Sequence, residues 1–352
     1  MKLIQTVDAE GTVLCHDITQ IIKGVTKDAV FRKGHVVTKE DIPVLLSVGK
    51  DQLYVWEKEE GMLHENEGAR ILCSLCQGSH MESSRPKEGK IELTAGCDGL
   101  FKVNHRGLMA VNTLGQMMIA TRHGNFPVKK GDKLAGTRII PLVIGAEKME
   151  AAEKAAMEAT GGKPILDLLP FVHKRVGIVT TGNEVYYKRI EDTFTPVITE
   201  KLGEFDTEVI SHVTWNDDDK KVTASILEMI GQGADVVICT GGMSVDPDDK
   251  TPLAIRNTGA RIVSYGAPVL PGAMFLLAYY EVKEEGRSRT AVIMGLPGCV
   301  MYAKRTIFDL VLPRVMADDE VTAGELAALG QGGLCLSCPV CTYPNCGFGK
   351  GM

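Results

Sequence analysis

The chain lacks an excess of positive charge and a long hydrophobic run. Its 39 Lys and Arg stand against 45 Asp and Glu, which gives a formal net charge of −6. This balance argues against a general nucleic-acid-binding protein, because such proteins need a basic surface. The longest apolar stretch, near 267–280, contains two prolines and is too short to span a bilayer. The N-terminal residues also lack the cationic and apolar segments of a signal peptide, so we expect a cytoplasmic protein with no membrane partner.

The length and the remaining composition are those of an ordinary globular protein. Apolar residues make up 44% of the chain and charged residues 24%, which is typical of soluble domains. A length of 352 residues is enough for two or three domains. We expect a β-rich accessory region at 1–170, an α/β domain at 171–317 and a cysteine-rich tail at 318–352.

Ten cysteines are unevenly placed along the chain. With no secretion signal, metal binding or redox chemistry is expected rather than a disulfide framework. Cys239 stands inside an apolar run and is expected to be an inert core thiol. Cys73 and Cys76 form a CxxC pair, which we interpret as buried or redox-inactive thiols.

The first half of the chain predicts short strands and few helices. We expect a helix at 41–46 and a strand at 51–56. Two strands, at 100–104 and 108–112, are expected to flank a turn. The Ala-, Glu- and Met-rich stretch 147–160 predicts a helix that ends at a Gly-Gly pair.

From residue 175 the pattern changes to an alternation of buried strands and helices. This alternation predicts a doubly wound, mostly parallel α/β sheet with helices on both faces. Strands are expected at 176–181, 207–214, 236–239, 261–264, 275–280 and 291–294, and helices at 193–203, 220–231, 252–257 and 299–316.

The stretch 234–252 contains the most informative turn. A continuously apolar run suits a strand buried on both faces, and it ends in Gly241-Gly242, followed by Ser244 and several aspartates. Glycines allow a backbone to turn sharply and approach a ligand, so amides of this turn are expected to face an anion and carboxylates to hold Mg²⁺. A plain connection with a solvated acidic loop explains this stretch alone about as well.

Three more polar or glycine turns follow predicted strands: 181–184, 217–218 and 295–298. The carboxyl ends of parallel strands meet at one edge of a sheet, where ligands bind. Four such turns at one edge predict a single anion-binding pocket rimmed by carboxylates.

Four motifs of this chain, in their order and spacing, resemble those of the molybdopterin-binding domain. They are TTGNE at 180–184, the acidic pair Asp217-Asp218, TGGMSVDPDDKTP at 240–252 and GLPG at 295–298. MoeA-like molybdenumtransferases, MogA-like adenylyltransferases and some competence-damage-type proteins share that domain. The resemblance covers about 175–314, and the first 170 residues are broadly compatible with the accessory domains of the MoeA-like group.

The resemblance implies molybdopterin or adenylated molybdopterin as ligand, molybdate as a small-molecule partner, Mg²⁺, and a homo-oligomer, either a dimer or a trimer. It implies catalytic roles for Glu184, Asp218 and Asp249, with Asp249 also a metal ligand. The residues that it implies for the pterin and phosphate site are Thr181, Gly182, Gly241, Gly242, Met243, Ser244, Thr251, Pro271, Gly272, Pro297 and Gly298.

The chain departs from the MoeA-like pattern at three positions. That group carries two lysines around a Pro-Gly turn, where this chain has Leu270 and Ala273, and an Asn where it has Cys299. We expect molybdopterin binding in molybdenum cofactor biosynthesis through a molybdenumtransferase-like step. The alternatives are a molybdopterin adenylyltransferase, a non-enzymatic pterin carrier or sensor, and a pyrophosphatase-like activity on a nucleotide.

The tail carries Cys335, Cys338, Cys341 and Cys346. Four thiols within twelve residues are able to wrap one metal ion or cluster. CxxCxxC resembles a ferredoxin-type loop, but the x4 spacing and the missing Cys-Pro differ, so Zn²⁺ and an iron–sulfur cluster remain equally open. A disordered, reducing tail is the third interpretation.

Overall fold

The computed structural model describes residues 2–22, 26–55, 60–244, 246, 249–284 and 287–351. The chain forms two compact units. The first comprises 1–96, 103–122 and 130–167, and the second comprises 97–102, 123–129 and 168–352. None of the described helices is long and apolar enough to cross a membrane.

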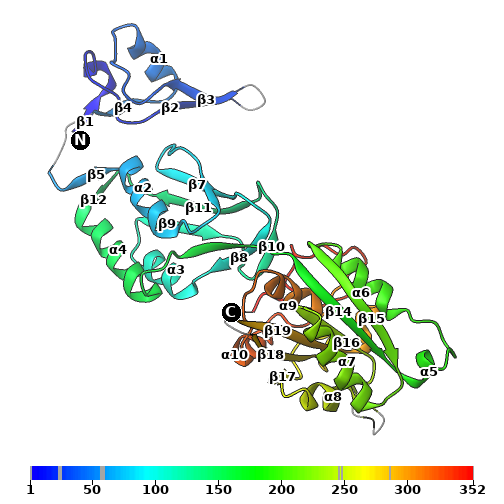
Figure 1. Cartoon of the computed structure of the whole chain (residues 1–352). Coiled ribbons are helices and arrows are strands. Elements are labelled where there is room, and N and C mark those ends of the chain that lie inside the picture. Colours follow the sequence, from blue (N-terminus) through cyan, green and yellow to red (C-terminus); the bar gives the residue numbers. More distant parts are fainter. Residues whose placement is uncertain are drawn as a thin grey trace. The chain divides into compact units, whose positions relative to one another are not determined.

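The first unit is rich in short antiparallel strands, as expected, and its largest sheet has the order β6-β7-β11-β9 (Figure 1). Smaller pairs are β1-β4, β2-β3 and β12-β5. Its elements are β1 (Lys2–Gln5), η1 (Thr6–Asp8), β2 (Ile18–Ile22), β3 (Thr26–Phe31), α1 (Asp41–Ser47), β4 (Gln52–Val55), β5 (Met62–His64), α2 (Glu65–Cys76), β6 (Met81–Ser83), β7 (Lys90–Ala95), α3 (His105–Asn112), β9 (Met117–Thr121), β11 (Lys133–Ile139), β12 (Val143–Gly145) and α4 (Ala146–Thr160).

One expectation for this half was wrong. The predicted strand at 108–112 belongs to helix α3. Asn104 caps that helix, because its side chain accepts a hydrogen bond from the Gly107 amide at 3.0 Å, and this local bond outweighs the strand-like apolar pattern. Trp56, the predicted end of a strand, lies outside the described residues. Cys73 and Cys76 are buried on α2, and burial raises the pKa of both thiols, as expected for inert core cysteines.

The second unit is built on a six-stranded sheet of the order β15-β14-β16-β19-β18-β17. The first four strands are parallel to one another. Strand β18 pairs antiparallel with β19, and β17 pairs antiparallel with β18. The expected mostly parallel sheet is therefore confirmed. Its strands are β14 (Lys174–Thr181), β15 (Thr207–Trp215), β16 (Val236–Thr240), β17 (Arg261–Tyr265), β18 (Leu276–Glu284) and β19 (Arg287–Leu296). A separate three-stranded sheet has the order β10-β8-β13, with β8 (Gly99–Val103), β10 (Phe126–Val128) and β13 (Leu166–Pro170).

Helices cover both faces of the six-stranded sheet. On one face, side chains of α6 and α9 pack with Val176, Ile238 and Leu296 in one core. On the other, α7 and α8 pack with Val179 and Val237 in a second core. Successive side chains along each strand point to opposite faces of the sheet, and each face packs into one of the two cores. This explains why the strands are continuously apolar. The helices are α5 (Asn183–Tyr186), α6 (Phe194–Leu202), α7 (Asp219–Gly231), α8 (Thr251–Asn257), η2 (Gly298–Met301), α9 (Ile307–Met316) and α10 (Ala323–Ala328).

The predicted helix at 299–316 is divided in two. A short 3₁₀ turn, η2, precedes α9, which begins after Thr306. Thr306 and Asp309 form a reciprocal capping box at that start, and such a box begins a new helix rather than continuing an old one.

The cysteine-rich tail is folded. Phe348 is 4% exposed and belongs to the core on the α9 face. The Tyr343 hydroxyl donates a hydrogen bond to the Asp309 carbonyl at 2.9 Å. The Leu270 amide donates to the Gly333 carbonyl, and the Cys335 amide donates to the Leu270 carbonyl, both at 2.8 Å. These contacts exclude a disordered tail.

Candidate functional site

The glycine turn at the end of β16 is forced by close packing against β14. Gly241 has φ +79° and Gly242 has φ +54°, a region that favours glycine. A Cβ at Gly241 would lie 2.0 Å from the Thr181 carbonyl oxygen, and one at Gly242 would lie 2.9 Å from the Thr251 hydroxyl. The turn therefore brings the backbones of two strand ends together with no room for a side chain.

Asp249 binds the backbone just beyond this turn. Its Oδ2 accepts a hydrogen bond from the Ser244 amide at 2.8 Å. The Tyr265 hydroxyl donates to the Met243 carbonyl at 3.0 Å, and the pKa of Tyr265 is raised, first by burial and then by the nearby Asp249 carboxylate. The carboxylate thus stands beside the glycine turn, as expected. Asp248 lies outside the described residues.

Three of the four predicted turns, at 181–184, 241–244 and 295–298, contribute to the wall of one cavity of about 600 Å³ at the carboxyl edge of the parallel strands, whereas the turn at 217–218 does not. Leu270, Ala273 and Cys299, the positions that depart from the MoeA-like pattern, are also in its wall. The predicted site residues that line it are Thr181, Glu184, Gly241, Gly242, Met243, Ser244, Asp249, Pro271, Gly272, Pro297 and Gly298.

Three predicted site residues are not in this wall: Gly182, Asp218 and Thr251. The Thr251 hydroxyl is buried and bonds the Thr181 hydroxyl at 3.0 Å, while Thr181 also donates to the Thr240 carbonyl at 3.1 Å. These bonds join the ends of β14 and β16 to the start of α8. Thr251 therefore stabilises the glycine turn through Thr181 rather than by lining the cavity.

Asp218 is the N-cap of α7. Its Oδ1 accepts hydrogen bonds from the Lys220 and Lys221 amides at 3.1 and 3.2 Å, which satisfies two amides of the first helical turn. Its other oxygen lies 3.8 Å from the Lys221 ammonium. Each carboxylate oxygen is thus engaged with its own helix.

We expect Asp218→Ala to lower the free energy of unfolding by about 1 kcal/mol, the usual cost of a lost cap. Asp218→Ser should keep most of that stability, because a hydroxyl caps equally well without the charge. Denaturant unfolding measures both variants. A loss of turnover in the stable Ser variant as large as that of an Asp249 variant would instead give Asp218 a direct catalytic role.

The sequence did not reveal Asp192, which also lines the cavity. Its carboxylate accepts hydrogen bonds from the Phe194 amide, at 2.9 Å, and from the Thr195 amide and hydroxyl, at 3.1 and 2.6 Å. Burial alone would raise the pKa of Asp192, but these bonds and the nearby His212 lower it overall, so the group is held as a carboxylate. Its only sequence signal was an Asp just before a predicted helix, which equally indicates a cap.

The wall of the cavity is acidic. Glu184, Glu191, Asp192 and Asp249 line it, and none of the described lining residues is Lys, Arg or His. An anionic ligand would be repelled by such a wall unless a cation neutralised it. Carboxylate oxygens are the ligands that Mg²⁺ prefers, so the residues fit a magnesium-bound anion. In the part of the chain that the structure describes, no group of three or more His, Cys, Asp or Glu is already arranged around one metal position.

The comparisons with known proteins agree with the motif resemblance. Residues 177–317 match the family described as a "Probable molybdopterin binding domain", which includes the whole wall of the cavity, from Thr180 to Tyr302. Residues 3–57 match a family described as a domain of unknown function. The resemblance that the motifs predicted is therefore confirmed for residues 177–317.

Two kinds of curated relatives are similar to this chain. A CinA-like protein of Mycobacterium tuberculosis is 36% identical over 94 residues, which are 26% of this chain and 22% of that protein. A molybdopterin molybdenumtransferase of Synechococcus elongatus is 26% identical over 244 residues, 64% of this chain and 55% of that protein. The chain thus spans about a fifth of the length of the first of these relatives and about half of the second.

Among solved structures, the tungsten cofactor synthesizing protein MoaB from Pyrococcus furiosus is 20% identical, with 42% of this chain and 89% of that chain covered and a TM-score of 0.31. The molybdopterin biosynthesis enzyme MoaB from Thermus thermophilus is also 20% identical, with 43% and 97% covered and a TM-score of 0.32.

Proposed function

We propose that this protein, whose residues 177–317 match a molybdopterin-binding family, binds molybdopterin or its adenylate with Mg²⁺ and carries out a molybdenumtransferase-like step with molybdate. The observation that supports this most strongly is that the cavity at the carboxyl edge of the sheet is lined entirely from the matched range. As part of the same proposal, the protein acts as a cytoplasmic homo-oligomer.

In this proposal the chain contributes two kinds of groups. The amides of the tight turn at Gly241 and Gly242 face the phosphate of the pterin, since backbone amides in such turns bind anions. The Asp249 carboxylate, beside the glycine turn, holds Mg²⁺ together with the phosphate of the ligand, and the cation neutralises the charge of phosphate and molybdate when bound. The residues thereby orient the ligand, while the acidic wall disfavours any anion that arrives without its cation.

Molybdopterin adenylyl transfer is the second candidate, and one observation favours it. The turn that carries Pro271 has Leu270 and Ala273 in the cavity wall, where the resemblance leads us to expect the lysines of molybdenumtransferases. An acidic, lysine-free wall suits a nucleotide that arrives already bound to Mg²⁺. Product analysis separates the two reactions: adenylyl transfer consumes ATP and molybdopterin, whereas the transferase step consumes adenylated molybdopterin and molybdate.

We expect molybdopterin or its adenylate to raise the melting temperature of the full chain in the presence of Mg²⁺. A ligand present at 100 times its dissociation constant stabilises the folded state by about 2.7 kcal/mol. Adding a chelator should remove most of this shift, because the acidic wall then repels the phosphate. A clear shift with an unrelated nucleotide and none with either pterin would contradict the proposal.

If both pterins bind and neither molybdate-dependent nor ATP-dependent turnover occurs, the protein is a pterin carrier rather than an enzyme. This outcome keeps the binding part of the proposal and removes the catalytic part. A nucleotide hydrolysed without transfer to the pterin would instead indicate the pyrophosphatase-like activity.

A further inference from the structure

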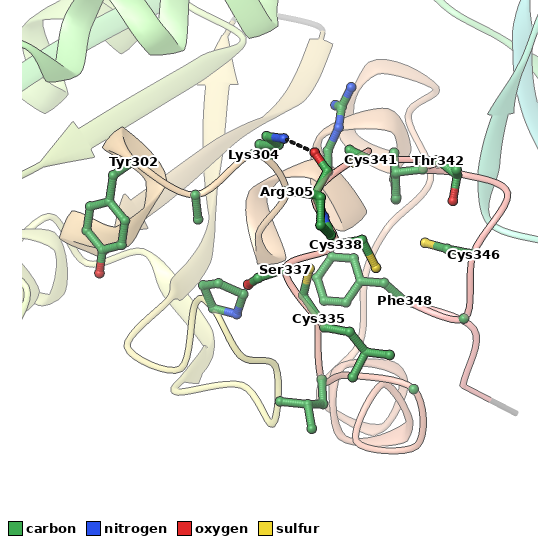
Figure 2. Close-up of a pocket in the computed structure, with 18 residues that line it drawn as sticks. Tyr302, Lys304, Arg305, Cys335, Ser337, Cys338, Cys341, Thr342, Cys346 and Phe348 are labelled. Atoms are coloured by element: carbon green, nitrogen blue, oxygen red, sulfur yellow. Dashed lines mark hydrogen bonds between the residues drawn. The ribbon is translucent and has the colours of Figure 1, made fainter.

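The four C-terminal cysteines line a second cavity, of about 560 Å³, which we call the cysteine cavity. Figure 2 shows Tyr302 on one side of it and the cysteines with Phe348 on the other. The metal site expected at these cysteines is not found, because among the described residues no group of three or more Cys, His, Asp or Glu could hold a metal ion. The volume is within the range of pockets that bind small organic molecules.

The wall of the cysteine cavity is mainly apolar and aromatic. Tyr302, Tyr343 and Phe348 contribute rings, and Leu334 and Leu336 contribute aliphatic side chains. Tyr302, Leu334 and Leu336 are 79%, 62% and 78% exposed, so apolar side chains gather at the surface around one cavity. Exposed apolar side chains that gather in this way mark binding sites, whereas single ones do not. A planar ring suits such a wall, because aromatic side chains stack on the faces of other rings.

The charges of the cysteine cavity are opposite to those of the cavity at the glycine turn, the pterin cavity. Among its described lining residues none is Asp or Glu, and Lys304 and Arg305 carry its charges. The described wall of the pterin cavity has four carboxylates and no cation. The Lys304 ammonium donates to the Pro339 carbonyl at 3.1 Å, which uses one of its three donors. Donors in an apolar wall suit a neutral ring whose nitrogens accept hydrogen bonds.

The two cavities adjoin each other. Pro271 and Tyr302 line both. The Leu270 amide donates to the Gly333 carbonyl, and the Cys335 amide donates to the Leu270 carbonyl, both at 2.8 Å. Hydrogen bonds thus join the turn in the wall of the pterin cavity to the segment that forms the cysteine cavity. A ligand whose phosphate lies at the glycine turn can therefore extend past Tyr302 into the cysteine cavity.

We propose that the cysteine cavity binds the purine ring of a nucleotide whose phosphates lie in the pterin cavity, and that this ring stacks on Tyr302. The identity of the nucleotide rests on the proposed function, since an adenylyl group belongs to adenylated molybdopterin in one candidate reaction and to ATP in the other. The glycine turn and Asp249 hold the Mg²⁺-bound phosphates, and the apolar cavity takes the uncharged ring. Most of this cavity is formed by 332–348, outside the matched range 177–317, so the family match does not supply it.

Alkylation of the native thiols tests the proposal. Cys338 and Cys341 are exposed in the wall of the cysteine cavity, Cys299 lines the pterin cavity, and Cys97 lines neither. The full chain is treated with iodoacetamide in Mg²⁺, with adenylated molybdopterin or ATP, and each thiol is followed by mass spectrometry. At ten times its dissociation constant, the bound nucleotide should slow alkylation of Cys338 and Cys341 roughly tenfold, because only the unoccupied fraction reacts.

Ligands without the purine are the matched controls for this experiment. Molybdopterin and inorganic triphosphate carry the phosphate but no adenine, so they should slow alkylation of Cys299 and leave Cys338 and Cys341 unchanged. Cys97 should react at the same rate with every ligand. This pattern separates occupation of the two cavities, since each has its own thiol.

Tyr302→Ala should raise the dissociation constant of the adenine nucleotide by roughly tenfold, the scale of one lost stacking side chain. Tyr302→Phe keeps the ring and should bind as the unchanged chain does. Both variants should bind inorganic triphosphate normally, which a loss of structure would not allow. Val340→Ala is the control from the same segment, because Val340 is 77% exposed and does not line the cavity, and its affinity should not change.

Three results would overturn the proposal. They are unchanged alkylation of Cys338 and Cys341 with both nucleotides, equal protection of these thiols by molybdopterin alone, and an unchanged nucleotide affinity in Tyr302→Ala. A melting-temperature shift with molybdopterin but no protection of Cys338 and Cys341 removes this inference and leaves the proposed function. Protection of these thiols by ATP, with no binding of either pterin, does the reverse.

Discussion

Gly241→Ala is expected to destabilise the second unit by about 3 kcal/mol or more. The left-handed conformation alone costs an L-residue roughly 1–2 kcal/mol, and φ at Gly241 is +79°. The new Cβ would also lie 2.0 Å from the Thr181 carbonyl oxygen, so β14 and β16 must separate, and such overpacking costs about 1–3 kcal/mol. Denaturant unfolding of the full chain, compared at an unchanged slope, measures the loss.

Gly298→Ala is the matched control from the same cavity. Gly298 also lines the site, but a Cβ there meets no atom within 4 Å. We expect its stability to change by less than about 0.5 kcal/mol, as for most exposed positions. Pterin affinity should fall sharply in the Gly241 variant and little in the Gly298 variant. Equal stability of the two variants would mean that the glycine turn is not tightly packed.

The sheet of the second unit was predictable because its signals are local. A run such as Val236–Thr240 is buried throughout. Because helices cover both faces of the sheet, such a strand has no solvent-facing polar residues, and its sequence is a continuous apolar run. The sites at the strand ends followed from topology, since parallel strands bring their carboxyl ends to one edge. This explains why most of the predicted turn residues lie in one wall.

Side-chain direction decided the points that the sequence pattern left ambiguous. The apolar run 108–112 fits a strand or a helix, and the Asn104 cap decided for helix α3. Asp218 and Asp249 both follow strands, yet one accepts amides of its own helix and the other faces the glycine turn. Asp192 reaches the wall of the cavity through tertiary packing, which spacing along the sequence does not reveal.

The cysteine cavity shows the same limit. The four thiols were evident from the sequence, but Pro271 and Tyr302 precede them by more than thirty residues and complete the cavity only through tertiary packing. The hydrogen bonds of Leu270 with Gly333 and Cys335 bring the tail to the pterin wall. No spacing rule predicts that proximity.

Asp249→Asn is expected to keep the fold and to lower turnover by roughly 10²-fold or more, the scale of a lost electrostatic group in a transition state. The Asn carbonyl can still accept the hydrogen bond from the Ser244 amide, now 2.8 Å from the carboxylate, so the loop should retain its shape. What is lost is a negative charge beside the glycine turn, and with it a ligand for Mg²⁺. Initial rates at varied Mg²⁺ measure the effect, which should include a weaker dependence on the cation.

A titration of Tyr265 reports the charge change independently of activity. Burial and then Asp249 raise the pKa of Tyr265, and removal of that negative charge eases formation of the phenolate, so the pKa should fall in Asp249→Asn. Asp246→Asn is the control, since Asp246 is exposed and does not line the cavity, and its turnover should change little. A lower Tyr265 pKa with full turnover would show that Asp249 is charged beside the turn but takes no part in the reaction. An unfolded Asp249→Asn variant would show that the carboxylate serves the loop itself.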